Sequence, residues 1–304
     1  MDAGMRVAIG VGVGVAALAG IGGVMLANRR DALDPGTSPG DDDGYPADPT
    51  YPVDPTYPVD PTYPVDPAYP VDPTYPGTVD GRERDLAAAF LTKAHATSAV
   101  SFDGASVRRA YDNFRRDPGI EPVAAGILAD AYANSPETMT YAKMRNAFAS
   151  MQSTAGYDAV TSALLTSAYA QSDNSIGGSD VRNRFQQFRA NTTSDTRAAA
   201  ELTVAYYTSP ETVTASEVST RFHNFRAELG VEPFAAALLT EAWANSHRDF
   251  TASDVRNNFN GFRELARSDA NTAAELTNAY ATSGQSYDRN DVMTTWRNMQ
   301  PSAG

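Results

Sequence analysis

The sequence contains no cysteine, only two lysines (Lys93 and Lys143) and only three histidines among its 304 residues. The absence of cysteine excludes a disulfide framework, a thiolate metal site and a thiol nucleophile. The three histidines, His95, His223 and His247, lie at unrelated positions, and none has a second histidine or a carboxylate at the spacing of a helical metal site. Because no serine lies in a recognisable nucleophile elbow either, we expect no enzymatic activity and no bound metal ion or cofactor.

Positive charge is scarce in the chain as a whole, which has a formal net charge of −13. Most of the negative charge lies in residues 29–80, which contain eleven acidic residues and two arginines. Residues 81–304 are close to neutral, with 21 basic and 25 acidic residues. A domain without net positive charge is not expected to bind nucleic acid.

An uncharged segment, residues 7–27, lies near the amino terminus between Arg6 and the pair Arg29-Arg30. It is long enough to span the ~30 Å hydrocarbon core of a bilayer as a helix. We interpret residues 1–30 as a single-pass transmembrane anchor, and we expect the rest of the protein to be extracytoplasmic.

Two further features of this segment bear on its role. Gly10 and Gly14 form a small-xxx-small pattern, which permits close pairing of two transmembrane helices and hence self-association. Ala17-Leu18-Ala19 resembles a signal-peptidase site, so a cleaved signal peptide is the alternative. Apolar residues continue to Leu26, which favours retention of the segment as an anchor.

Residues 31–80 form an acidic, low-complexity linker built on Tyr-Pro-Val-Asp-Pro-Thr hexads. Between Tyr45 and Pro76 proline recurs at every third residue. Polyproline II has three residues per turn, so these prolines share one edge of an extended helix. At ~3.1 Å per residue this segment predicts a semi-rigid spacer of about 95 Å.

The remainder, residues 81–304, consists of six repeats of 37 residues without a single insertion. When the six repeats are aligned at this period, equivalent positions form columns of similar residues. These include a leucine column, an alanine column and two aromatic columns. The leucines are Leu91, Leu128, Leu165, Leu202, Leu239 and Leu276, and the second aromatic column is Tyr111, Phe148, Phe185, Phe222, Phe259 and Trp296.

Each repeat carries signals for the starts of two helices. In the second half, a capping residue is followed three residues later by an acid in four of the six repeats, and apolar residues flank the cap as a hydrophobic staple, as in Val213-Thr214 with Glu217 and Val218. In the first half, proline suits the first helical position, as at Pro122 and Pro233, or aspartate suits the cap. Each repeat therefore predicts a helix–loop–helix unit.

One amphipathic helical hairpin cannot bury its own apolar face, so neighbouring repeats must stack and share a core. The sequence thus predicts an all-α domain of twelve short helices, arranged as an α-solenoid-like array of six helix–loop–helix repeats.

The segment Val213-Thr214-Ala215-Ser216-Glu217-Val218 resembles the second half of an EF-hand loop and the start of its exiting helix. The 37-residue spacing is also similar to that of EF-hands, and this resemblance implies paired EF-hand-like hairpins and a calcium response. The first, third and fifth loop positions would be Tyr206, Thr208 and Pro210, none of which is a carboxylate. The third repeat comes nearest, with Asp173 and Asn174.

Two columns of arginine recur in the second half of the repeats, seven residues apart and on nearly the same helix face. We predict that stacking aligns them into a stripe that binds an acidic partner, either a protein or an acidic polymer. The alternative is that their stems cover aromatic residues while their charges pair with acids such as Glu201, Glu241 and Glu275. The two columns are Arg108, Arg145, Arg182 and Arg256, and Arg115, Arg189, Arg226 and Arg263.

Together these features predict a membrane-anchored helical-repeat scaffold or binding protein, displayed on a polyproline spacer. Two alternatives remain open at this stage. One is a degenerate EF-hand-like calcium-responsive protein, and the other is a structural membrane protein of a particle such as a virion.

Overall fold

The computed structural model describes residues 79–98, 102–136, 138–172, 175–209, 213–248, 250–284 and 287–300. The predicted anchor (1–30) and all but the last two residues of the predicted linker (31–80) lie outside these ranges. Among the described residues, no helix has the length and apolarity needed to cross a bilayer.

The described residues form twelve α-helices and no strand, so the all-α prediction is confirmed. The first helices of the six repeats are α2 (Val79–Thr97), α4 (Pro122–Asn134), α6 (Ala159–Gln171), α8 (Thr196–Thr208), α10 (Pro233–Ala244) and α12 (Ala270–Thr282). The second helices are α3 (Gly104–Arg115), α5 (Tyr141–Ala155), α7 (Gly178–Asn191), α9 (Ala215–Leu229), α11 (Ala252–Ala266) and α13 (Arg289–Met299).

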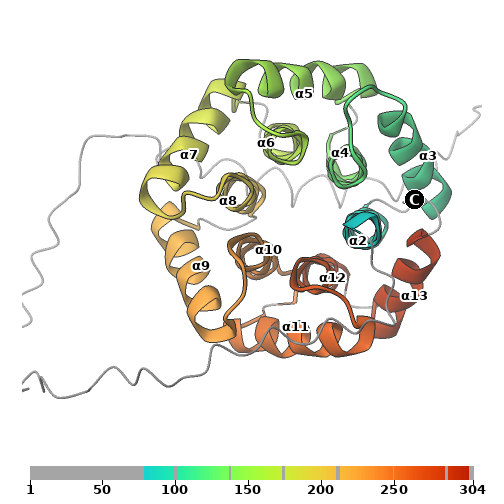
Figure 1. Cartoon of the computed structure of the whole chain (residues 1–304), viewed down its shortest axis with the longest axis vertical. Helices are drawn as coiled ribbons and strands as arrows, with labels where there is room; N and C mark the ends of the chain where they lie inside the picture. Colours follow the sequence, from blue (N-terminus) through green and yellow to red (C-terminus); the bar gives the residue numbers. More distant parts are fainter. Residues whose placement is uncertain are drawn as a thin grey trace, which may run out of the picture.

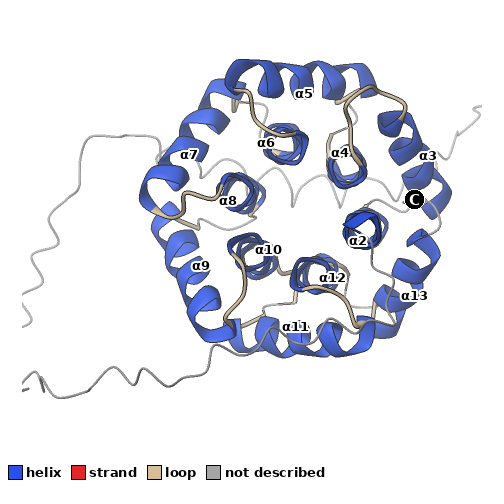
Figure 2. Cartoon of the chain, in the orientation of Figure 1, coloured by secondary structure: helices blue, strands red, loops and turns tan. Residues whose placement is uncertain are grey.

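The two sets of helices form two concentric layers (Figure 1). The first helices are seen end-on around a central axis, and the second helices run around them as an outer layer (Figure 2). The repeats therefore stack as expected, but the array does not end in two free faces. It closes on itself, because α2 of the first repeat packs against α12 of the last.

The predicted helix starts are confirmed by the caps. The side chain of Thr214 accepts a hydrogen bond from the Glu217 N–H, and the Glu217 carboxylate accepts one from the Thr214 N–H at 2.8 Å. The same reciprocal box starts α11 and α13. Pro122 and Pro233 stand at the first positions of α4 and α10. These local interactions fix where each helix begins without reference to the rest of the fold.

The core lies between the two layers and follows the predicted columns. All six residues of the leucine column are fully buried, and the six residues of the second aromatic column are at most 6% exposed. The alanine column, Ala94 to Ala279, is also fully buried. Small side chains there let the inner helices approach closely, which is what a narrow inner layer requires.

The EF-hand-like interpretation requires a loop at positions where the structure has a helix. Tyr206 and Thr208, the first and third positions of the expected loop, belong to the last turn of α8. The similar half of the motif is the capping box and staple that start α9. Pro210, Asp173 and Asn174 lie outside the described residues.

Candidate functional site

The first arginine column lies at the joints between successive outer helices. Arg145 at the start of α5 forms an ion pair of 2.6 Å with Asp117, and Arg256 on α11 forms one with Glu228 at the end of α9. Arg108 on α3 donates to the backbone carbonyl of Asn298 on α13 at 3.0 Å. This contact joins the first and last outer helices, where the ring closes. Three of the four predicted arginines are thus engaged with the preceding outer helix.

Arg182, the fourth member of this column, differs from the other three. Within the described residues it forms no ion pair with a carboxylate, and its Nη1 donates to the Met151 sulfur at 3.9 Å. The sequence explains the difference. Asp117 and Glu228 each lie 28 residues before their arginine, and the residue 28 positions before Arg182 is Thr154.

The second arginine column packs along its own helices. Arg189, Arg226 and Arg263 each lie over the phenylalanine one turn earlier, at 5.7–5.9 Å from the ring centroid. Arg115 instead donates to the Ile120 carbonyl. Three of these four arginines therefore cover an aromatic ring, as the alternative interpretation expects.

A groove of about 580 Å³ lies at the joint between α5 and α7, where Arg182 is located. Its charged lining residues are Lys143 and Arg182, and Met139, Met151 and Tyr169 supply apolar surface. The Lys143 ammonium donates to the Thr138 carbonyl at 2.8 Å and forms no ion pair within the described residues. We call this site the α5–α7 groove.

Two positions at which the repeats differ in side-chain size open the groove, and at this joint both hold small residues. In the next two repeats, Arg184 and Arg221 lie over Tyr206 and Trp243, at 4.2 and 4.6 Å from the ring centroids. The equivalent position on α5 is Ala147, which leaves Tyr169 without such a cover.

The second of these positions is that of Gly178, which the larger side chains of Tyr141 and Arg289 fill in two other repeats. Tyr141 packs against Phe114 at the α3–α5 joint, with ring centroids 4.7 Å apart. Arg289 donates to Asn258 at the α11–α13 joint at 2.7 Å. Sequence reasoning missed Arg184 and Arg221 and overlooked Ala147 and Gly178. Their two 37-residue columns mix small and large residues, with alanine also at position 110 and glycine also at position 104.

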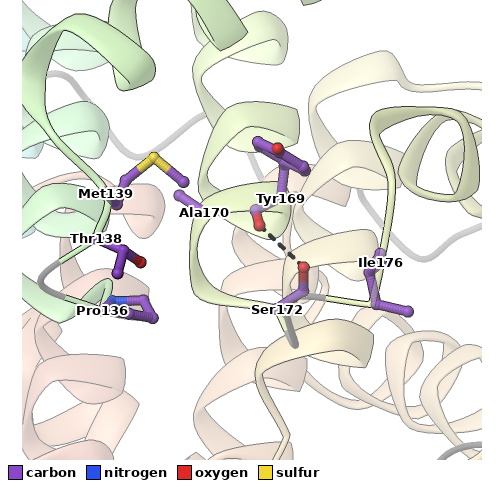
Figure 3. Close-up of a pocket in the computed structure, with 7 residues that line it drawn as sticks. All are labelled: Pro136, Thr138, Met139, Tyr169, Ala170, Ser172 and Ile176. Carbon is purple, nitrogen blue, oxygen red and sulfur yellow. Dashed lines mark hydrogen bonds between the residues drawn. The ribbon is translucent and has the colours of Figure 1, made fainter.

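A smaller cavity of about 60 Å³ adjoins this groove and shares Met139 and Tyr169 with it. Figure 3 shows Met139 extending from the loop before α5 toward the α6 residues. The Ser172 hydroxyl, at the end of α6, donates to the Tyr169 carbonyl at 2.9 Å and fixes the lower wall. The groove thus has an apolar extension beside its two cations.

A second polar site lies on the axis of the inner layer. The axial charge cluster consists of Lys93, Asp130, Glu201, Glu241 and Glu275, all on inner helices and all buried. Lys93 Nζ lies 3.5 Å from Asp130, 2.9 Å from Glu241 and 3.9 Å from Glu275. Glu201, Glu241 and Glu275 are the acids that our alternative paired with arginines. That pairing is wrong, because Glu241 and Glu275 lie beside Lys93 and Glu201 shares a hydrogen bond with Glu241.

Burial and neighbouring charges shift the pKa values of the groups in this cluster. Although burial opposes its charge, the carboxylates of Asp130 and Glu241 hold the pKa of Lys93 well above its ordinary value. Burial raises the pKa of Asp130 to about 6. Burial also raises the pKa of Glu275, and burial together with the carboxylate of Glu241 raises the pKa of Glu201.

Glu241 is the exception among the four acids. Burial alone would raise its pKa, but the Lys93 ammonium and hydrogen bonds from its neighbours lower it. The cluster therefore contains a buried Lys93–Glu241 ion pair, flanked by two carboxyls, Glu201 and Glu275, whose pKa values are raised well above the ordinary value.

Among the described residues, no group of three or more histidines, cysteines or acids is arranged to hold a metal ion. The sequence matches no protein-family profile and no curated protein. The geometry of the groove and of the axis is therefore the basis for inferring function.

Proposed function

We propose that this chain is a membrane-anchored helical-repeat binding protein that captures an acidic segment of a partner protein in the α5–α7 groove. Residues 7–27 would hold it in the bilayer, and the proline-rich linker would carry the closed ring away from the surface. The observation that supports the binding site is Arg182, a cation without a carboxylate partner, in a groove of about 580 Å³.

The chemistry of the groove indicates an acidic peptide. Lys143 and Arg182 supply two positive charges, while Met139, Met151 and Tyr169 offer apolar contact between them. Gly178 and Ser179, in the first turn of α7, place the positive end of that helix on the same groove. An extended segment with aspartate or glutamate beside an apolar side chain would satisfy both the charge and the surface.

The volume of the groove is in the range of ligand sites, which is about 300–1,000 Å³. A charge-assisted hydrogen bond to arginine contributes roughly 1.5–3 kcal/mol where it is shielded from water. Arg182 is only half-buried, so we expect the lower part of this range. Binding should weaken with salt because the two cations remain accessible to counter-ions.

An array of ten-residue synthetic peptides, varied in acidic and apolar content, tests this proposal on the full-length chain. Peptides with two or more acids beside an aromatic or aliphatic residue should be retained, and Arg182→Ala should weaken their retention about tenfold. Arg256→Ala is the matched control, since Arg256 is in the same column but is paired with Glu228. Equal loss in both variants, or retention of basic peptides, would refute the groove as the site.

A further inference from the structure

The inner helices enclose a cavity of about 160 Å³ at one end of the axis. Its rim is one column of the repeat, with one residue from each of the six repeats, and every rim residue stands at the carboxyl end of an inner helix. The six are Thr97, Asn134, Gln171, Thr208, Asn245 and Thr282. We call this site the axial cavity.

Six helix carboxyl termini meet around this cavity. Equivalent positions in successive inner helices touch one another, as Thr97 does Asn134 and as Asn245 does Thr208, so the inner helices run parallel and in register. The carboxyl end of each helix carries a partial negative charge from its unpaired carbonyls. A ring of six such ends favours a cation at its centre.

The threonines of the rim direct oxygen acceptors rather than protons toward the cavity. The hydroxyls of Thr97, Thr208 and Thr282 each donate to the backbone carbonyl one turn earlier, at 2.7–2.8 Å. A hydroxyl has one proton and two lone pairs, so each of these oxygens retains acceptor capacity, although those of Thr97 and Thr208 already accept one hydrogen bond each, from Asn134 and Asn245. The remaining acceptor capacity favours a ligand that donates hydrogen bonds.

Asn245 provides an independent sign of a missing donor. Its side chain is 7% exposed and lines the cavity. The amide Nδ2 donates to Thr208 Oγ1 at 2.6 Å and to Glu241 Oε1 at 3.3 Å, but Oδ1 has no hydrogen-bond partner. A buried acceptor without a partner is costly, so a donor placed against it is favoured.

The charges beneath the rim are compatible with one additional cation. Lys93 and Glu241 line the floor and neutralise each other as an ion pair. Burial raises the pKa of Asp130 to about 6, so this carboxyl is largely ionised at neutral pH. His247 lies at the exposed edge. Lys93 is shared between the carboxylates of Asp130 and Glu241, so negative charge remains beneath the rim, apart from the helix ends.

The donor set distinguishes between classes of cation. The rim consists of neutral amide and hydroxyl oxygens, and no metal-holding group of three acids or histidines lies in the described part of the chain. The cavity has the volume of about five water molecules at ~30 Å³ each, which is more than a bare ion needs. A compact alkylammonium ion, with three N–H donors and a short apolar tail, satisfies these conditions.

We propose that the axial cavity binds a small primary alkylammonium ion, with its N–H groups directed at Asn245 Oδ1 and the threonine hydroxyl oxygens. This site lies on the axis of the inner layer and is independent of the α5–α7 groove on the outside. It also resembles the environment that the protein already gives to its own Lys93 ammonium, which is held by carboxylates on the same axis.

Isothermal titration calorimetry of the full-length chain with ethylammonium chloride tests the proposal, with sodium, potassium and calcium chlorides as comparisons. We expect one ethylammonium ion per chain. Asn245→Ala should weaken its binding about tenfold or more, as expected for loss of a hydrogen bond to a charged group.

The control is Asn258→Ala, which removes an asparagine of similar burial (5% exposed) on α11, away from the axis. It should leave the affinity unchanged within about twofold, a difference too small to represent a lost hydrogen bond. If Asn245→Ala unfolds the chain, Thr282→Val provides the same test. Absence of ethylammonium binding, an unchanged affinity in the rim variants, or saturation by calcium alone would each overturn the assignment.

Discussion

The indole N–H of Trp296 in the last helix donates to the backbone carbonyl of Asp85 in the first described helix, at 3.0 Å. The side-chain amide of Gln300 reinforces this contact by donating to the Asp85 carboxylate at 3.1 Å. Trp296 occupies the column that Phe222 holds in the interior of the array. The repeat at the point of closure thus has the larger ring and an additional donor where the chain must join its own beginning.

The closure predicts a graded response to substitution at Trp296. Trp296→Phe keeps the buried ring and loses one hydrogen bond, so it should lower the free energy of unfolding by about 1 kcal/mol. Trp296→Ala also empties the core position and should cost about 3–5 kcal/mol. Urea denaturation followed by circular dichroism measures both. Similar, small losses in both variants would show that the ring does not depend on this joint.

The leucine column predicts a large effect for one substitution and almost none for its control. Leu202 is fully buried on α8, so Leu202→Ala should cost about 2–5 kcal/mol. Leu265 on α11 is 51% exposed, and Leu265→Ala should change stability by less than ~0.5 kcal/mol. The two variants remove the same atoms, so equal melting temperatures would contradict the assignment of the core.

The axial charge cluster predicts that stability falls as the pH rises from about 4 to about 6. The pKa of Asp130 is raised from 3.8 to about 6 by burial, so in this window the folded state holds a proton that the unfolded chain has released. The unfolded state is therefore favoured increasingly as the pH rises, by up to roughly 3 kcal/mol at 1.36 kcal/mol per pKa unit.

Asp130→Asn isolates the contribution of this residue, because an amide of the same shape does not titrate. The variant should show a flatter dependence of unfolding free energy on pH between about 4 and 6 than the native chain. The raised pKa values of Glu201 and Glu275 should make stability decline with rising pH in both proteins. A native stability that increases steadily from pH 4 to 6 would contradict the assigned protonation.

The parts of the fold that depend on local interactions could be predicted from the sequence, and those that depend on closure could not. Thr214 and Glu217 start a helix through contacts three residues apart, so their pattern is sufficient. Lys93 and Glu241 are separated by 148 residues, or four repeats, and they meet only because the array closes into a ring. The 37-residue period predicts stacking but leaves the rotation per repeat undetermined, since that depends on how closely the inner helices approach.

The same distinction applies to the groove. The arginine columns could be identified from spacing alone, but which arginine is unpaired depends on Asp117, Thr154 and Glu228, residues of the preceding outer helix or its end. That Asp117 and Glu228 lie opposite their arginines can be recognised only once the direction of the outer helices is known. Ala147 and Gly178 are informative for the same reason, because some other repeats place a larger side chain at each of these positions to fill a joint.

The central claim is that Arg182 in the α5–α7 groove binds an acidic partner segment, and fluorescence anisotropy tests it most directly. A labelled acidic peptide selected from the array would be titrated with the native chain, Arg182→Ala and Arg256→Ala at two salt concentrations. We predict that Arg182→Ala weakens binding about tenfold, as expected for loss of a charge-assisted hydrogen bond, and leaves the melting temperature unchanged. Arg256→Ala should bind normally. If Arg182→Ala binds as the native chain does, or loses binding only because it unfolds, the claim is wrong.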